Sequence, residues 1–356
     1  MRHGLMLWRE GELSQADVLA RQRRLQAAMR ENGLDAVLVY TNHVRSAGVT
    51  YLTGFTPYWS DALLFVPREG QAIFATALSK RVGNWIRSTN PTVEIAHSPQ
   101  PGRMAGERLS ALSAGNIGVV ELDRMPSGLV EEITSKTDAR LIDATDIFAA
   151  VRALPNAAEL ALATTADRIA ANAFAEIPAD RRLVGDVTEV LELNARLAGA
   201  EECYVAAAPD LAADQRLARM KGNAPLGGYF AIRLSVAYNG VWIRRTESLA
   251  RMAADGAVAE AARAADRLAE AIDPSAQPAP QIAGHALSAG MTILDWTVEA
   301  PVATRPLQPV ASRSRPAMRD VPYGVLTLTI GTAHTPLVFT RSFGLARQTA
   351  RGGGVA

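Results

Sequence analysis

The segment 228–249 constrains the fold of this chain more than any other part of the sequence. Two stretches of alternating apolar and polar residues meet there at Asn239-Gly240. Both residues tolerate positive φ, so the pair is the strongest short-range signal for a tight β-hairpin turn. A hairpin that turns at these residues has one register, and the register determines which side chains share a face.

That register brings two arginines together. Ser235 lies opposite Arg244, which places Arg233 on the same face as Arg244, at the diagonal position. Trp242 also falls on this face, whose other positions are small or polar. The opposite face of the first strand is continuously apolar, with Phe230, Ile232, Leu234 and Val236. The sequence therefore predicts one packed face and one face that lines a pocket.

Composition excludes several classes of function. The 356 residues include 37 Lys+Arg and 36 Asp+Glu, so a net charge of +1 favours neither nucleic acid nor an anionic membrane as a partner. No segment approaches the ~20 apolar residues of a membrane span, and no signal-peptide pattern is present. The single cysteine, Cys203, excludes a disulfide framework and a thiolate metal cluster. We therefore expect a cytoplasmic protein.

The pattern along the chain predicts two domains. Short apolar runs predict strands at 36–40, 62–66, 72–76 and 117–122, between helices at 15–32, 104–114 and 127–135. Beyond Val151 the pattern changes to long helices at 157–177, 186–199 and 256–272, with strand pairs at 228–249 and in parts of 290–300 and 323–343. We predict a first domain at 1–150, a second at 151–346 and a disordered tail at 347–356.

Several of these stretches, taken in order, resemble the creatinase and aminopeptidase P family. Residues 21–39 (RQRRLQAAMRENGLDAVLV) and 51–55 (YLTGF) resemble the opening of that family's N-terminal domain, and 151–159 resembles the entry to its catalytic domain. Matching segments then follow in family order at 185–200, 205–209, 228–249 and 337–344. The resemblance implies an α/β (α+β) protein, in which a creatinase-type N-terminal domain precedes a pita-bread domain. It also implies a homodimer, or a heteromer with a family paralogue.

Catalysis in the resembled family rests on two metals held by two aspartates, a histidine and two glutamates. In the matching register, the two aspartate positions hold Arg233 and Arg244. The family's histidine positions fall on Gln215, Met291 and Val298, its first glutamate falls on Ile330 or Gly331, and its last glutamate falls on His334. This alignment uses Glu299-Ala300-Pro301 as an anchor, and His285 offers a competing register. The resemblance therefore implies that this chain binds no metal or other cofactor and is not a metallopeptidase.

Two alternatives follow from the paired arginines. A guanidinium is always charged and only donates, so the pair repels a metal cation and requires a negative partner when buried. The partner is either an acid of the chain, which would make the pocket an internal salt-bridge plug, or a bound carboxylate or phosphate. Asp295, Glu299 and Glu247 are the candidate acids, although Glu247 faces away in a regular hairpin.

Two further residues are candidates. His334 is the histidine that the alignment places at a family active-site position, where it would carry a proton; the alternative is a structural histidine on a strand. Arg45 precedes the YLTGF motif, and in creatinase an arginine of the N-terminal domain helps to hold the substrate carboxylate. The alternative for Arg45 is a solvated loop.

We therefore expect a metal-free pseudo-peptidase that binds a small anionic or peptide-like ligand or partners an active paralogue. The alternative is a metal-independent, creatinase-like hydrolase or lyase that acts on a C–N bond of a small carboxylate-bearing amide or guanidino compound.

Overall fold

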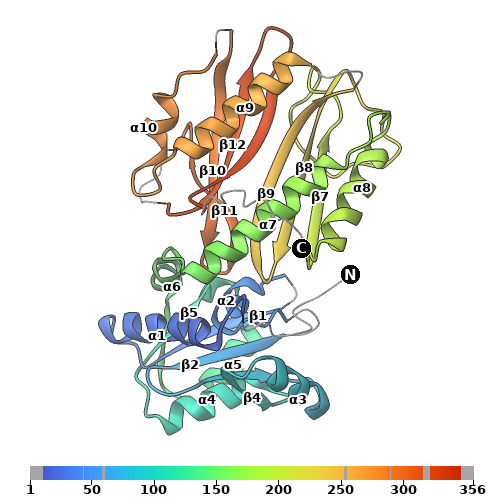
Figure 1. The fold of residues 1–356 in the computed structure, drawn as a ribbon. Helices are drawn as coiled ribbons and strands as arrows, with labels where there is room; N and C mark the ends of the chain where they lie inside the picture. The colour runs from blue at the N-terminus through green and yellow to red at the C-terminus, as the bar shows by residue number, and fades with distance from the viewer. Residues whose placement is uncertain are drawn as a thin grey trace, which may run out of the picture. The chain divides into compact units, whose positions relative to one another are not determined.

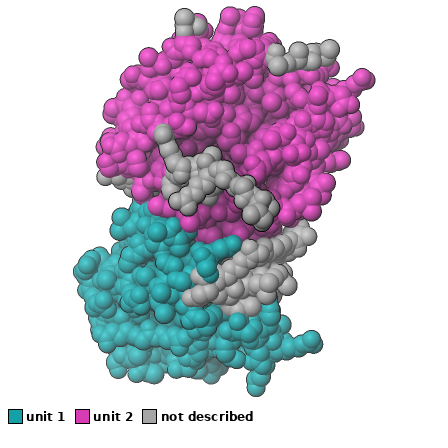
Figure 2. Space-filling view, viewed as in Figure 1, with its two compact units in different colours: residues 1–158, 301–308 teal, residues 159–300, 309–356 magenta. Residues whose placement is uncertain are grey.

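The structure, a computed structural model, describes residues 11–42, 44–57, 61–251, 255–288, 290–315 and 321–345. The chain forms two compact units, residues 1–158 with 301–308 and residues 159–300 with 309–356 (Figure 2). The boundary predicted at 150 and 151 falls inside a helix, Thr145–Arg152. The predicted tail at 347–356 lies outside the described residues.

Unit 1 is built on a six-stranded mixed sheet in the order β4-β3-β2-β1-β5-β6 (Figure 1). Its strands are β1 Ala36–Thr41, β2 Ala62–Pro67, β3 Ala72–Thr76, β4 Val93–His97, β5 Asn116–Val120 and β6 Arg140–Asp143. Its helices are α1 Gln15–Glu31, α2 Ala47–Thr53, α3 Lys80–Thr89, α4 Pro101–Ala111, α5 Ser127–Thr134 and α6 Thr145–Arg152, with a 3-10 turn at Leu122–Arg124.

Helices cover both faces of this sheet. Val37 and Val39 of β1 pack in a core with residues of α1, α2 and α6, whereas Leu38 packs on the other face with residues of α4 and α5. This alternation gives each face of a buried strand its own apolar layer. The mixed α/β architecture predicted for the N-terminal part of the chain is confirmed.

Local signals account for the ends of α1. The Ser14 hydroxyl accepts a hydrogen bond from the Asp17 backbone N–H, and the Asp17 carboxylate accepts one from the Ser14 N–H, which together form a capping box. The helix ends before Gly33, whose φ of +64° favours glycine. The helix predicted at 15–32 is thus confirmed to within one residue.

Unit 2 is built on a seven-stranded sheet in the order β11-β10-β12-β13-β9-β8-β7. Its strands are β7 Glu202–Ala208, β8 Tyr229–Tyr238, β9 Val241–Ala250, β10 Thr292–Val302, β11 Arg305–Ser312, β12 Gly324–Gly331 and β13 Leu337–Phe343. Its helices are α7 Ala157–Ala175, α8 Val184–Leu197, α9 Gly256–Ala271 and α10 Pro278–Ala283. The turn of the β10–β11 hairpin, 301–308, belongs to unit 1.

Helix α8 begins earlier than the sequence suggested. The expected helix opened at Asp186, but Asp186 lies within the first turn, and its carboxylate accepts hydrogen bonds from the backbone N–H groups of Arg182 and Leu183 at 2.7 and 2.8 Å. The acid therefore caps the helix by reaching backwards, which also places its charge favourably at the helix N-terminus.

The two faces of the unit 2 sheet differ in chemistry. Helix α9 packs on one face, against apolar side chains of β10, β12 and β13. That face also carries an ionic cluster in which Arg341, whose side chain is 5% exposed, pairs with Glu247 and Asp266. The face that points away from α9, which we call the inner face, carries Arg233, Arg244 and Thr246 on β8 and β9.

The helices of the described residues bear on the expectation that no segment spans a membrane. Among the described residues, no single helix is long and apolar enough to cross a membrane, although the bent pair α6 and α7 passes jointly on length and composition.

The hairpin turn yields a stability prediction. Asn239 and Gly240 have φ of 47° and 76°, as a type I′ turn requires. Gly240→Ala should lower the free energy of unfolding by about 1–2 kcal/mol, because a Cβ is disfavoured in the left-handed region. Denaturant unfolding followed by circular dichroism measures the change. Gly256→Ala is the control, because Gly256 has open space and no positive φ; equal stability of both variants would contradict the assigned turn.

Candidate functional site

The β8–β9 register brings the paired arginines together as the sequence predicted. Ser235 pairs with Arg244 and Arg233 pairs with Thr246 across the two strands. Glu247 lies on the opposite face, where it pairs with Arg245 and Arg341. The predicted common face of Arg233 and Arg244 and the outward direction of Glu247 are both confirmed.

Hydroxyl groups on the neighbouring strand hold both guanidinium groups by Nε. Arg244 Nε donates to Ser235 Oγ at 3.1 Å, and Arg233 Nε donates to Thr246 Oγ1 at 3.2 Å. Thr246 is fully buried and also accepts a hydrogen bond from Thr340 Oγ1 at 2.7 Å. Because a neutral hydroxyl occupies Nε, an acid or an anion can pair with each arginine only through its terminal nitrogens.

The two arginines differ in their acidic partners. Arg244 Nη1 lies 2.5 Å from Glu299 Oε1, and both side chains are largely buried. Arg233 forms no ion pair with any residue in the described part of the chain, and Thr246 is its one hydrogen-bond partner there. Glu299 therefore compensates one of the two positive charges, which leaves the second without an acid.

The pKa of Arg233 reflects this imbalance. Burial and, next, the charge of Arg244 lower the pKa of Arg233 to about 10, while Glu299 acts in the opposite direction. At neutral pH the group is still charged. The site therefore holds a half-buried cation that has no ion pair with an acid in the described part of the chain, and such a group favours a bound anion.

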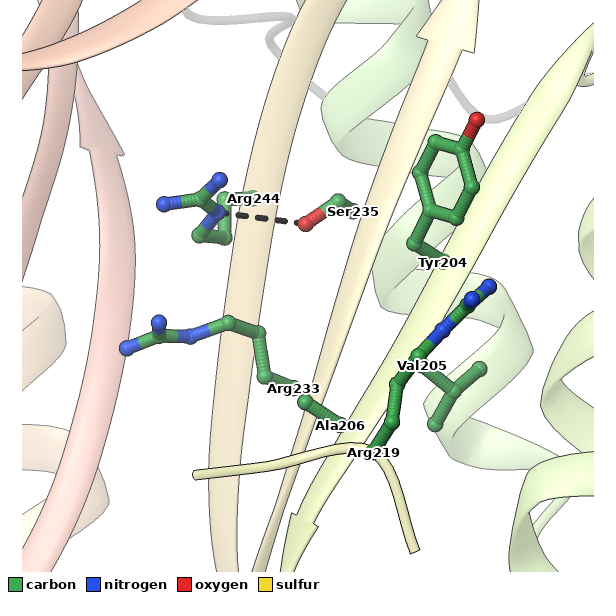
Figure 3. A pocket seen from close by; sticks show the side chains of 7 residues that line it. All are labelled: Tyr204, Val205, Ala206, Arg219, Arg233, Ser235 and Arg244. Carbon is green, nitrogen blue, oxygen red and sulfur yellow. Dashed lines mark hydrogen bonds between the residues drawn. The ribbon is translucent and has the colours of Figure 1, made fainter. Parts of the chain in front are cut away.

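A pocket of about 380 Å³ opens beside these groups (Figure 3). It is lined by Tyr204, Val205, Ala206, Arg219, Arg233, Ser235 and Arg244. None of these seven residues is an acid or a histidine, and three are arginines. The strands β7, β8 and β9 form its wall, and Arg219 comes from the chain between β7 and β8. The arrangement suits binding of a small anion.

Arg219 and Tyr204 line the pocket, although no sequence pattern marks either residue. Tyr204 pairs with Ser235 across β7 and β8, and its ring stacks on Trp242 with a centroid distance of 5.6 Å and an interplanar angle of 7°. Trp242 is thus beside the pocket rather than among its lining residues. The alternation of β7 is weak in the sequence, and Arg219 lies in a segment without periodicity, so neither residue gave a usable signal.

The residues at the inner face do not fit the dinuclear metal centre that the resemblance describes. Arg233 and Arg244, which the resemblance aligns with the two aspartates, are cationic, and guanidinium nitrogens do not ligate metal ions. Val298 and Ile330 are fully buried in the core that faces α9, and Met291 packs against the same core. Gln215 donates a hydrogen bond to the Leu211 carbonyl. Throughout the described ranges, no group of three His, Cys, Asp or Glu residues is arranged to hold a metal ion.

His334 does not lie at this site. It is exposed in the turn that precedes β13, whereas Thr340, further along β13, is the residue that pairs with Thr246. His334 contributes to the lowered pKa of Asp255, to a smaller extent than the Tyr229 hydroxyl does. The interpretation of His334 as a strand histidine is wrong, because it lies in the turn before β13. It is not among the residues that line the pocket, and a role as a proton carrier stays a prediction.

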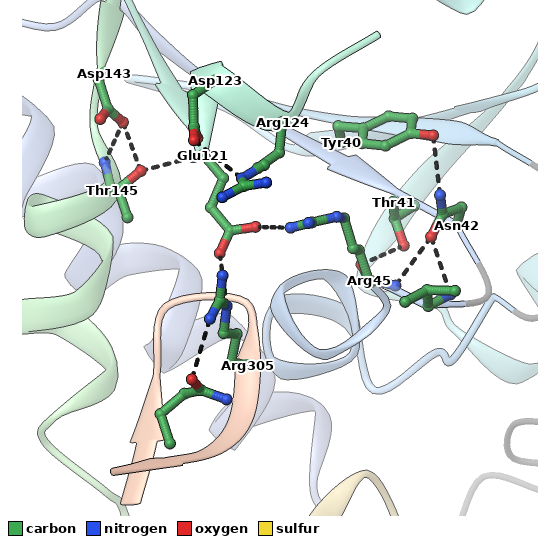
Figure 4. A network of polar contacts seen from close by, with 12 residues as sticks. Tyr40, Thr41, Asn42, Arg45, Glu121, Asp123, Arg124, Asp143, Thr145 and Arg305 are labelled. Atoms are coloured by element: carbon green, nitrogen blue, oxygen red, sulfur yellow. Dashed lines mark hydrogen bonds and ion pairs between the residues drawn. The ribbon is translucent and has the colours of Figure 1, made fainter. Parts of the chain in front are cut away.

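Arg45 is held within unit 1 (Figure 4). Its guanidinium pairs with the carboxylate of Glu121, which also lies 3.7 Å from Arg305 Nε. Glu121 has a positive φ of 54°, and its backbone N–H donates to Thr145 Oγ1 at 2.7 Å. Arg45 therefore has an acid partner, and a solvated loop does not describe it. A role in ligand binding stays a prediction.

Comparisons with known proteins agree with this architecture. Residues 21–154 match the family model of the creatinase/prolidase N-terminal domain. No curated protein matches the chain by sequence.

Three solved structures illustrate the likeness over the whole chain. The Xaa-Pro dipeptidase from Bacillus anthracis is 16% identical with a TM-score of 0.67, over 92% of this chain and 95% of that one. The X-Pro aminopeptidase from Thermotoga maritima MSB8 is 16% identical with a TM-score of 0.66, over 89% and 94%. The prolidase from Pyrococcus horikoshii OT3 is 14% identical with a TM-score of 0.64, over 92% and 96%. At these identities the likeness concerns the fold.

The Arg244–Glu299 pair yields a second prediction. Glu299→Gln should lower the free energy of unfolding by about 1–3 kcal/mol, because it leaves two adjacent half-buried cations without an acid. The double variant Arg244→Met/Glu299→Gln should lose less stability than the sum of the losses in Arg244→Met and Glu299→Gln. Chemical denaturation of the four proteins in a double-mutant cycle measures the interaction. Strict additivity would show that the pair contributes nothing.

The cationic residues at the inner face yield a third prediction, which concerns metal binding. Protein purified after growth with added Mn²⁺, Co²⁺ or Zn²⁺ should contain no stoichiometric metal by elemental analysis, because Arg233 and Arg244 share the inner face and guanidinium groups do not ligate metal ions. Two bound ions per chain would contradict the register on which the site is built.

Proposed function

We propose that this chain, a member of the creatinase and prolidase superfamily by its N-terminal domain and its fold, is a metal-free pseudo-peptidase whose inner-face pocket binds a small carboxylate- or phosphate-bearing ligand. The relatives named above include Xaa-Pro peptidases, so a peptide-like ligand with a free carboxylate falls within this proposal. The proposal extends to an assembly of two chains, either identical or with an intact paralogue.

One observation carries the proposal. Arg233 is half-buried, is held through Nε by Thr246 and has no acid partner among the described residues, although Glu299 pairs with the adjacent Arg244. A pocket that served as an internal plug would be expected to neutralise both cations, because leaving a buried charge unpaired costs several kcal/mol. Here one charge remains, and its free nitrogens belong to a side chain that lines an open pocket.

The pocket lining favours binding over hydrolysis. Hydrolysis of an amide or guanidino compound without metal requires a general base within hydrogen-bonding distance of the attacking water. The seven lining residues include no Asp, Glu or His, and Glu299 is engaged by Arg244. A small anion held by a guanidinium fork needs none of these groups.

Calorimetric titration tests the proposed function. Acetate and inorganic phosphate should bind, whereas acetamide, which has the shape of acetate without its charge, should not. Arg233→Ala should abolish binding, since it removes the free fork. A saturating anion at 100-fold excess over its Kd should stabilise the wild type by about 2.7 kcal/mol.

Arg216→Ala is the control variant, because Arg216 is 90% exposed, pairs with Asp214 and does not line the pocket. It should bind both anions as the wild type does. Equal binding of acetate by the wild type and Arg233→Ala would sink the proposal.

The lowered pKa of Arg233 makes anion binding dependent on pH. Below about pH 10 the guanidinium of Arg233 is charged in the folded protein. The affinity for acetate should therefore be constant between pH 7 and 9 and should fall as the pH rises through about 10. Arg233→Lys should lose affinity at lower pH, because a lysine starts from a pKa of ~10.4 and the same burial lowers it further. Affinities measured by titration across this range decide the point, and identical profiles for both proteins would contradict the assignment to this residue.

A further inference from the structure

A third arginine, Arg219, is positioned at the edge of the pocket by its backbone. The adjacent residue Ala218 exchanges two backbone hydrogen bonds with Ala207 of β7, at 2.8 and 3.0 Å. These bonds attach the segment to the strand that carries Tyr204 and Ala206, two residues of the pocket wall. Arg219 is exposed, yet its main chain has a defined place beside the site.

The guanidinium of Arg219 is held by an aromatic face and not by an acid. Its central carbon lies 5.5 Å from the ring centroid of Tyr204. Such a contact uses the flat face of the guanidinium and leaves its in-plane N–H donors unused. Arg219 has no hydrogen bond or ion pair within the described part of the chain. Arg216, on the same segment, instead donates to both carboxylate oxygens of Asp214 at 2.9–3.0 Å.

The aromatic support of Arg219 is itself fixed. Tyr204 stacks on Trp242, which pairs with Ala237, and Ala237 pairs with Glu202 of β7. Trp242 therefore approaches Tyr204 from the end of β7 that carries Glu202. Arg219 follows Ala218, whose bridge to Ala207 lies toward the other end of β7. Tyr204 thus contacts both Trp242 and Arg219, and these contacts make its ring a support for the Arg219 guanidinium.

The guanidinium groups of the three pocket arginines lie at two separate positions. Figure 3 shows the guanidinium groups of Arg233 and Arg244 together on one side of the pocket, and that of Arg219 on the other side, beside Tyr204. These three cations have Glu299 as their one acidic partner among the described residues. Two positive charges are therefore left over, and they belong to separate ends of a pocket of about 380 Å³.

We propose that the ligand of this pocket is an elongated dianion, with one anionic group held by Arg233 and Arg244 and a second anionic group held by Arg219. The chemical class that fits is an acyclic dicarboxylate. A compact anion such as phosphate reaches only one of the two places. This inference rests on the proposed function and adds the second anionic group and the residue that recognises it.

The experiment compares carboxylates of equal length. Succinate, glutarate and adipate are titrated beside butanoate, pentanoate and hexanoate, with inorganic phosphate as the compact anion, into the wild type, Arg219→Gln and Arg216→Gln. The best dicarboxylate should bind the wild type at least about tenfold more tightly than its monocarboxylate, which is the gain expected from one further charge-assisted interaction. Arg219→Gln should remove this advantage and leave the monocarboxylate Kd within about twofold. Arg216→Gln should behave as the wild type.

The outcomes separate this inference from the proposed function. Two results would exclude a dianionic ligand and leave the proposed anion pocket in place. In the first, monocarboxylates or phosphate bind through Arg233, but the dicarboxylates bind no more tightly than the monocarboxylates. In the second, Arg219→Gln weakens the binding of dicarboxylates and monocarboxylates equally. If the wild type binds no anion in either series, both fail. Melting curves of Arg219→Gln exclude misfolding as a cause, because the replaced side chain is exposed.

Discussion

The register of the β8–β9 hairpin is the constraint on which the inner face depends. Because Asn239 and Gly240 form the turn with positive φ, Arg233 is placed opposite Thr246 and Arg244 opposite Ser235. Each arginine thus meets a hydroxyl that accepts its Nε–H. The terminal nitrogens of Arg233 are left to the pocket, whereas Nη1 of Arg244 pairs with Glu299. A shift of one residue would turn both arginines into the apolar layer on the other face.

The chemistry of this face follows from how its charges are compensated. On the face that packs against α9, Arg341 has two acids within ion-pair distance, which is how a protein usually stabilises a buried guanidinium. On the inner face, Glu299 serves Arg244 alone. The same sheet therefore contains a neutralised cationic cluster and an under-compensated one. This contrast within one domain is the basis on which we propose that the inner face binds an anion.

Sequence reasoning succeeded where a local rule fixed the geometry. The Asn239-Gly240 turn predicted the arginine pair, and the alternation of β8 predicted its apolar and pocket-lining faces. Reasoning failed where tertiary contacts decide the position. Asp186 caps α8 from within its first turn, His334 lies in a turn because β13 starts later, and the Arg219 segment is placed by its bridge to Ala207. Glu299 was one of three candidate acids, and its ion pair with Arg244 joins β10 to β9 across the two strands between them, a contact that no local sequence rule predicts.

Anomalous diffraction from two soaked crystals tests the central claim most directly. One crystal is soaked in bromide, whose anomalous signal marks an anion, and the other in Mn²⁺, whose signal marks the metal of a dinuclear centre. The account predicts a bromide peak at the terminal nitrogens of Arg233 and no manganese peak on the inner face of the sheet. A manganese peak between β8 and β9, or bromide that avoids Arg233, would contradict it.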